Sequence, residues 1–178
     1  IQYDSDEAVK YIDELTEFFS YNAILASSEL AKERGSYKTY SGYLWDKGIL
    51  HIDTYNNLMA YRGNKTEPQT GSESVDWETL RDHITKYGMR NSVICETMPT
   101  ASTSKIVKNY ECCETIMTNM YSRRVLSGDH LVINKYMVQD LQLLGIWSKE
   151  LKDSSVANNG SIGNVDIHQF IKDKYKTV

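Results

Sequence analysis

Proline, cysteine and glycine are all scarce in this sequence of 178 residues, which contains two prolines, three cysteines and ten glycines. So little proline and glycine excludes a collagen-like or low-complexity chain. Long hydrophobic runs are also missing: no stretch approaches the roughly 20 apolar residues that span a bilayer, so we expect no membrane association. The net charge is −4, which argues against a nucleic-acid partner because nucleic-acid-binding domains usually carry a basic surface.

The three cysteines, Cys95, Cys112 and Cys113, do not form a disulfide framework, because their number is odd and two of them are adjacent. We interpret the adjacent pair as ordinary thiols, since a disulfide between neighbours requires an unusual peptide geometry. The sequence has no Cys-x-x-Cys pair and no Cys/His spacing typical of a zinc site, so no metal site is expected. A reducing compartment, the cytoplasm, fits this cysteine content.

What is present is a set of helical patterns in a chain whose length suits one domain. Apolar residues recur about every 3.6 residues over residues 5–34 and predict a long, packed structural helix. Asp76 is positioned to cap a second helix that ends at Gly88, and Asn134 to cap another that ends at Gly145. Further short helices are predicted over residues 147–157 and 167–175.

Short apolar runs between these helices predict strands. We expect a short strand at residues 49–53 and a buried strand at residues 92–95. Two extended pieces, residues 125–126 and 131–133, are expected on either side of the turn at residues 127–129. Residues 56–75 are the least hydrophobic stretch and are expected to form a surface loop, an insertion in the domain. Helices alternating with short strands predict an α/β fold.

One segment combines several residues that could bind an anion. Thr100, Ala101, Ser102 and Thr103 follow a predicted strand and precede a predicted helix start. A helix start offers unpaired N–H groups and a partial positive charge, so this turn could cradle a phosphate. Ser and Thr at such a position also serve as ordinary helix caps, and the residues alone leave both interpretations open. Neither of the two glycine-rich nucleotide-binding loops is present.

Other polar residues give weaker signals. Arg123 and Arg124 could pair with phosphate, although neighbouring arginines more often form structural ion pairs. The four histidines are scattered and match no metal-binding or catalytic-triad pattern.

A series of motifs, in the same order along the chain, resembles the large catalytic subunit of class I ribonucleotide reductase, most closely its eukaryotic and large-DNA-virus branch. The central motifs are Lys-Tyr-Gly-Met-Arg-Asn-Ser at residues 86–92, Met-Pro-Thr-Ala-Ser-Thr at 98–103 and Thr-Asn-Met-Tyr-Ser-Arg-Arg-Val-Leu-Ser-Gly at 118–128. Upstream matches lie at residues 30–33, 37–42 and 47–50, and downstream matches at 140–147, 159–162 and 175–178. The resemblance therefore covers nearly the whole chain.

This resemblance implies that residues 1–178 are part of the ten-stranded α/β barrel of the reductase, helix-rich with short strands. It also implies that Thr100, Ala101, Ser102 and Thr103 bind the diphosphate of a ribonucleoside diphosphate substrate. The family's radical-bearing cysteine, reducing cysteine pair, radical-relaying tyrosines and N-terminal ATP cone have no counterpart in this sequence. We therefore expect a fragment of a longer protein with no catalytic residue of its own, which fits a chain that begins at Ile1 instead of Met.

The activity implied for the parent protein is reduction of ribonucleoside diphosphates to deoxyribonucleoside diphosphates for DNA synthesis, by thiyl-radical chemistry. The resemblance further implies a small subunit with a metal and tyrosyl radical, a thioredoxin- or glutaredoxin-type reductant, ATP and deoxynucleotide effectors, and a homodimer of large subunits. The chain alone is expected to be inactive. The alternative is a non-catalytic split or decayed reductase module that acts as an assembly partner.

Overall fold

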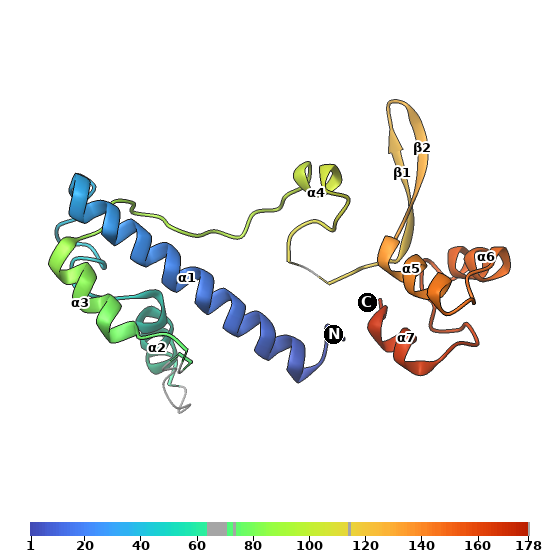
Figure 1. The fold of residues 1–178 in the computed structure, drawn as a ribbon, viewed down its shortest axis with the longest axis horizontal. Helices are drawn as coiled ribbons and strands as arrows, with labels where there is room; N and C mark the ends of the chain where they lie inside the picture. The colour runs from blue at the N-terminus through green and yellow to red at the C-terminus, as the bar shows by residue number, and fades with distance from the viewer. Residues whose placement is uncertain (64–70, 73, 114, 178) are drawn as a thin grey trace. The chain divides into compact units, whose positions relative to one another are not determined.

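A computed structural model describes residues 1–63, 71–72, 74–113 and 115–177, and its ribbon is drawn in Figure 1. The chain divides into a helical unit, Lys10–Glu96, and a hairpin unit, which combines Ile1–Val9 with Thr97–Val178. The helices and strands of the described residues are, in chain order, α1 (Asp6–Arg34), α2 (His51–Tyr61), α3 (Trp77–Tyr87), α4 (Thr103–Ile106), β1 (Met120–Val125), β2 (Gly128–Ile133), α5 (Lys135–Leu143), α6 (Lys149–Ala157) and α7 (Gln169–Lys174).

The helical unit packs apolar side chains of α1 and α3, together with those of the segments that flank α2 and α3, into one core. The buried members of this core are Ile24, Leu50, Trp77, Leu80, Ile84 and Met89. Burying one such side chain fully contributes about 1.5–3 kcal/mol. The ends of α3 are locally encoded, as predicted: the Asp76 carboxylate accepts from the Thr79 N–H at 3.0 Å, and Gly88 ends the helix with φ +80°. A Cβ at Gly88 would collide with the Ser36 side chain, so glycine is required there.

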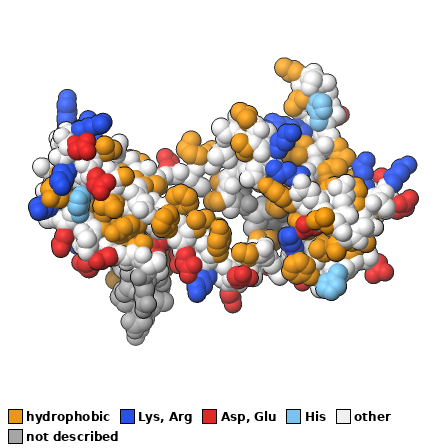
Figure 2. Space-filling view, viewed as in Figure 1, with side chains coloured by type: hydrophobic (Ala, Val, Ile, Leu, Met, Phe, Trp, Pro, Cys, Tyr) orange, Lys and Arg blue, Asp and Glu red, His pale blue; other side chains and the backbone are white. Residues whose placement is uncertain are grey.

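The N-terminal half of α1 departs from the packed helix that was predicted. Within α1 the buried residues are Ile24, Ser27, Ser28 and Ala31, all in its second half. Ile12, Phe18 and Phe19 are each more than half exposed, and Figure 2 shows hydrophobic side chains on the surface along this helix. The helical period is therefore correct, but much of the apolar face in the first half of α1 is exposed in the described part of the chain.

The hairpin unit is built on an antiparallel pair of strands, which confirms two extended pieces joined by a turn. The turn lies at residues 126–127 instead of 127–129, because Gly128 and Asp129 pair within the hairpin. The register runs from Met120 opposite Ile133 to Val125 opposite Gly128. Each following helix begins at a side-chain cap: Asn134 for α5, Ser148 for α6 and His168 for α7. The buried core of this unit consists of Met120, Met137, Leu141, Leu151, Ile162, Ile171 and Tyr175.

The strand predicted at residues 49–53 is wrong, because these residues begin a helix. Leu50 is the N-cap of α2, and its N–H donates to the Asp53 carboxylate at 2.8 Å. Asp53 is also held by Arg81 of α3, at 2.7 Å. The loop predicted at residues 56–75 is wrong in its first part, which belongs to α2. Residues 64–70 and 73 of that loop lie outside the described residues.

The buried strand predicted at residues 92–95 is also wrong: the segment belongs to no helix or strand and pairs with no strand in the described part of the chain. Val93 is 71% exposed, whereas Ile94 packs against the core of the helical unit. The sheet of the described residues has two strands, so the chain is helix-rich with short strands as expected, without the ten-stranded barrel. None of the described helices is both long enough and apolar enough to cross a membrane.

Candidate functional site: the turn before α4

The predicted anion-binding turn lies at the start of α4 in the hairpin unit. Residues 97–99 belong to no helix or strand, residues 101–102 form a turn, and α4 begins at Thr103. Thr100 has a φ of +48°, and its carbonyl accepts from the Ser104 N–H at 3.0 Å, which closes the turn. The helix start is therefore confirmed, whereas the strand predicted before it is absent among the described residues.

The turn presents polar groups that the protein itself does not use. All four residues from Thr100 to Thr103 are exposed. In the part of the chain that the structure describes, the N–H groups of Ala101, Ser102 and Thr103 donate to no acceptor, and the Ser102 side chain makes no capping hydrogen bond. Three consecutive unpaired donors beside small hydroxyl side chains are suited to an anion. Ser102 therefore does not act as an ordinary side-chain cap of α4.

Thr100 is fixed by a contact from a segment further along the chain. Its Oγ1 accepts from the Cys112 N–H at 2.9 Å. The Sγ atoms of Cys112 and Cys113 are 3.9 Å apart, well beyond the roughly 2 Å of a disulfide bond, so both are thiols as predicted. The contact places the adjacent cysteines beside the candidate turn, which their positions in the sequence do not indicate.

Ser104 is a polar residue of this region that the sequence does not single out. It is 4% exposed, and its Oγ has no hydrogen-bond partner among the described residues. A buried hydroxyl without a partner costs about 1–3 kcal/mol. The serine continues the hydroxyl-rich run of the turn, but burial depends on how α4 packs, which no local pattern predicts.

Two neighbouring charges are already neutralised within the hairpin unit. Lys105 of α4 lies 2.7 Å from the Glu111 carboxylate, and this hydrogen bond raises the pKa of the lysine. Arg124 pairs with Asp129 across the hairpin at 2.9 Å. Arg124 therefore forms a structural ion pair. The donors that the candidate turn offers to a ligand come from its backbone and its hydroxyl groups. Among the described residues, no group of three or more His, Cys, Asp or Glu side chains could hold a metal ion.

Comparison with known proteins gives a match along the entire chain. The model of the ribonucleotide reductase barrel domain matches residues 1–178. The chain is 43% identical over 177 residues to the ribonucleoside-diphosphate reductase large chain of Cryptosporidium parvum, covering 99% of this chain and 21% of that protein. It is 43% identical over 177 residues to the large subunit of Arabidopsis thaliana, with 99% and 20% covered.

A third relative is the ribonucleoside-diphosphate reductase large chain 2 of Saccharomyces cerevisiae, which is 41% identical over 179 residues, covering 100% of this chain and 19% of the yeast protein. The chain thus spans about a fifth of the length of these curated relatives.

Proposed function

The chain belongs to the ribonucleotide reductase family, and from this premise we propose that it forms part of an enzyme that reduces ribonucleoside diphosphates to deoxyribonucleoside diphosphates. Within that enzyme, its role is to bind the diphosphate of the substrate through Thr100, Ala101, Ser102 and Thr103. The relatives are named as ribonucleoside-diphosphate reductases, which supports the substrate class.

The observation that carries this assignment is the row of three N–H groups, at Ala101, Ser102 and Thr103, that have no acceptor among the described residues. Phosphoryl oxygens accept hydrogen bonds from exposed backbone N–H groups at helix starts, where the peptide dipoles also favour negative charge. The methyl side chain of Ala101 leaves room for a phosphate to approach the backbone closely. The hydroxyl groups of Ser102 and Thr103 add two further donors.

Holding the diphosphate has a consequence for the reaction, although these residues do not touch the reacting atoms of the sugar. A fixed diphosphate restricts where the ribose can lie relative to the groups that attack it. When an enzyme holds a whole substrate in a reactive geometry, this positioning can lower the activation free energy by about 7–11 kcal/mol. The turn supplies one part of that positioning.

The remaining parts of the enzyme are included in the same proposal. They are a small subunit that generates the radical from a metal and a tyrosine, a thioredoxin- or glutaredoxin-type reductant, and ATP and deoxynucleotide effectors. A second large subunit would complete a homodimer, and the location would be the cytoplasm. The thiyl radical would form on a cysteine outside this chain.

The test is the double substitution Ser102→Ala and Thr103→Ala in a complete large subunit. A hydrogen bond to a charged group contributes about 1.5–3 kcal/mol, so we expect KM for a ribonucleoside diphosphate to rise by about tenfold or more. Effector binding should stay unchanged. Ser127→Ala, which removes an exposed hydroxyl group from the hairpin turn, is the matched control. An unchanged KM in the double variant would refute the assignment.

A further inference from the structure

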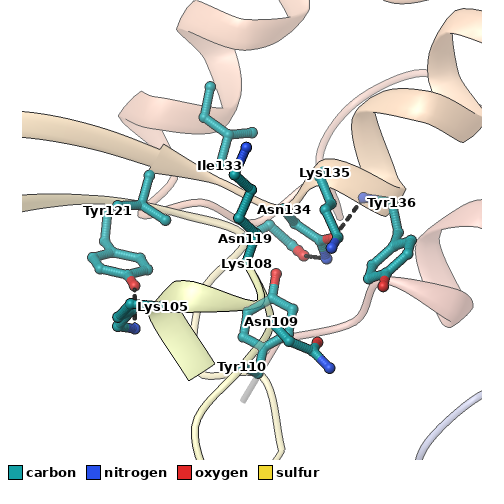
Figure 3. Close-up of a pocket in the computed structure, with 11 residues that line it drawn as sticks. Lys105, Lys108, Asn109, Tyr110, Asn119, Tyr121, Ile133, Asn134, Lys135 and Tyr136 are labelled. Atoms are coloured by element: carbon teal, nitrogen blue, oxygen red, sulfur yellow. Dashed lines mark hydrogen bonds between the residues drawn. The ribbon is translucent and has the colours of Figure 1, made fainter. Parts of the chain in front are cut away.

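A cavity of about 320 Å³ lies in the hairpin unit beside α4. Its walls come from α4 and the segment that follows it, from the open end of the β1–β2 hairpin, and from the start of α5, as Figure 3 shows. Among the described residues, the lining contains three lysines, three tyrosines and three asparagines and no carboxylate. A volume of this size is at the lower end of the range, about 300–1,000 Å³, that is typical of small-molecule sites.

The charge of this cavity is positive, although the chain as a whole has a net charge of −4. Of the three lysines in the lining, Lys105 is neutralised by Glu111. Lys108 and Lys135 form no ion pair within the described residues, and Lys135 Nζ lies 4.7 Å from the centre of the Tyr136 ring. Two cations that line one cavity and have no carboxylate partner in the described part of the chain favour an anionic ligand.

The tyrosines give the cavity aromatic walls. Tyr110 and Tyr121 are half-buried, whereas Tyr136 is 46% exposed at the start of α5. Burial and the neighbouring tyrosines raise the pKa of Tyr110 to about 12, so its hydroxyl group is a neutral donor at physiological pH. Aromatic faces of this kind stack on planar rings, and each base–aromatic contact is worth about 1–3 kcal/mol.

The floor of the cavity is held by hydrogen bonds that the ligand would not need to rearrange. Asn134 Nδ2 donates to Asn119 Oδ1 at 2.8 Å, and Asn119 Nδ2 donates to the Tyr175 carbonyl at 2.7 Å. Asn134 Oδ1 accepts from the Tyr136 N–H at 3.1 Å, a bond drawn in Figure 3. Because both asparagines are buried and hydrogen-bonded, the cavity is formed before any ligand enters, which reduces the cost of binding.

We propose that this cavity binds a mononucleotide, with the phosphate on Lys108 and Lys135 and the base against the tyrosine rings. The site is separate from the turn at Thr100–Thr103, since none of those four residues lines the cavity. It is a second nucleotide site in the hairpin unit, and it does not depend on the substrate-binding role proposed for the turn.

The proposal is tested by equilibrium binding of AMP to the 178-residue chain, with adenosine and ribose 5-phosphate as the two half-ligands. AMP should bind at least about tenfold more tightly than either half-ligand, because it satisfies both the lysines and the rings. The double substitution Lys108→Met and Lys135→Met should weaken AMP binding by about tenfold or more and leave the affinity for adenosine unchanged. Tyr136→Leu should reduce AMP binding to the level of ribose 5-phosphate.

The control is Lys149→Met, which removes an exposed lysine of α6 in the same unit and should leave AMP binding unchanged. Each variant is compared with the parent chain by thermal unfolding, and these surface substitutions should leave the midpoint temperature of unfolding unchanged. The substitutions Ser102→Ala and Thr103→Ala should not affect AMP. If they abolish AMP binding while the lysine substitutions do not, AMP binds at the turn and the cavity proposal fails. Absence of AMP binding, or equal affinity for AMP and ribose 5-phosphate, also overturns it.

Discussion

Asn119 is a buried amide that joins three parts of the hairpin unit, and its removal is the sharpest test of how that unit is held together. The residue is 1% exposed. Its Nδ2 donates to the Tyr175 carbonyl after α7, and its Oδ1 accepts from Asn134, the cap of α5. Asn119→Ala leaves the carbonyl of Tyr175 and the amide of Asn134 without these partners.

The size of the effect follows from the burial of both partner groups. Asn134 is 3% exposed and Tyr175 is 5% exposed, so water does not readily replace the lost bonds. A buried polar group left without a partner costs about 1–3 kcal/mol. Two such groups predict a loss of about 2–6 kcal/mol, a large fraction of the roughly 5–15 kcal/mol that stabilises a typical domain.

The assay is urea unfolding of the chain together with hydrogen exchange of the α5 and α7 amides. Both helices should exchange faster in Asn119→Ala, while the amides of α3 in the helical unit keep their protection. Asn164→Ala, at an exposed asparagine, is the control and should change stability by less than about 0.5 kcal/mol. A loss below about 1 kcal/mol for Asn119→Ala would show that the buried network does not stabilise this unit.

Two further predictions concern Asp140 and Ser104. Hydrogen bonds from Lys174 and Tyr175, each 2.6 Å long, lower the pKa of Asp140. Its contribution to stability is therefore complete above the unfolded-state pKa of about 3.9 and is lost as the pH falls through the lower folded-state value. Thermal unfolding between about pH 2 and 6 should show a shallower acid dependence for Asp140→Asn, and an identical profile would contradict this. Ser104→Ala removes the unpaired buried hydroxyl group and should raise the free energy of unfolding in urea by about 1 kcal/mol, whereas a loss of that size would mean that the hydroxyl has a partner.

The helices of this chain could be predicted because their signals are local. Asp76 and Asn134 cap α3 and α5 through side-chain contacts two or three residues away. The turn between β1 and β2 lies at residues 126–127, directly before Gly128, so the hairpin was predictable from its turn residues to within a residue or two. In each case the residues that decide the structure are neighbours in the sequence.

The failed strand predictions have one physical cause, which is that a strand needs a partner. Residues 49–53 contain a short apolar run that favours a strand, but the Asp53 carboxylate accepts from the Leu50 N–H, and α2 begins here instead. Residues 92–95 have the composition of a buried strand and stay unpaired within the described residues. Strand pairing depends on segments far away in the sequence, so a short apolar run does not determine it.

The same distinction applies to the candidate sites. The turn at Thr100–Thr103 could be found because four consecutive small residues carry the signal. Its contact with Cys112 could not, since it depends on how the chain returns after α4. The cavity was missed for a similar reason: Lys108, Tyr121 and Lys135 belong to three separate segments that only the fold brings together.

The turn at Thr100–Thr103 is the part of the chain that we propose binds the diphosphate of the substrate. The most direct measurement is a thermodynamic cycle that combines the protein variant with a change of ligand. The Kd of a ribonucleoside diphosphate and the Kd of the matching ribonucleoside are each measured for a complete parent large subunit and for its Ser102→Ala/Thr103→Ala variant. We expect the double variant to weaken binding of the diphosphate by about tenfold or more and to leave binding of the nucleoside unchanged. Equal changes for both ligands, or no change for either, would contradict it.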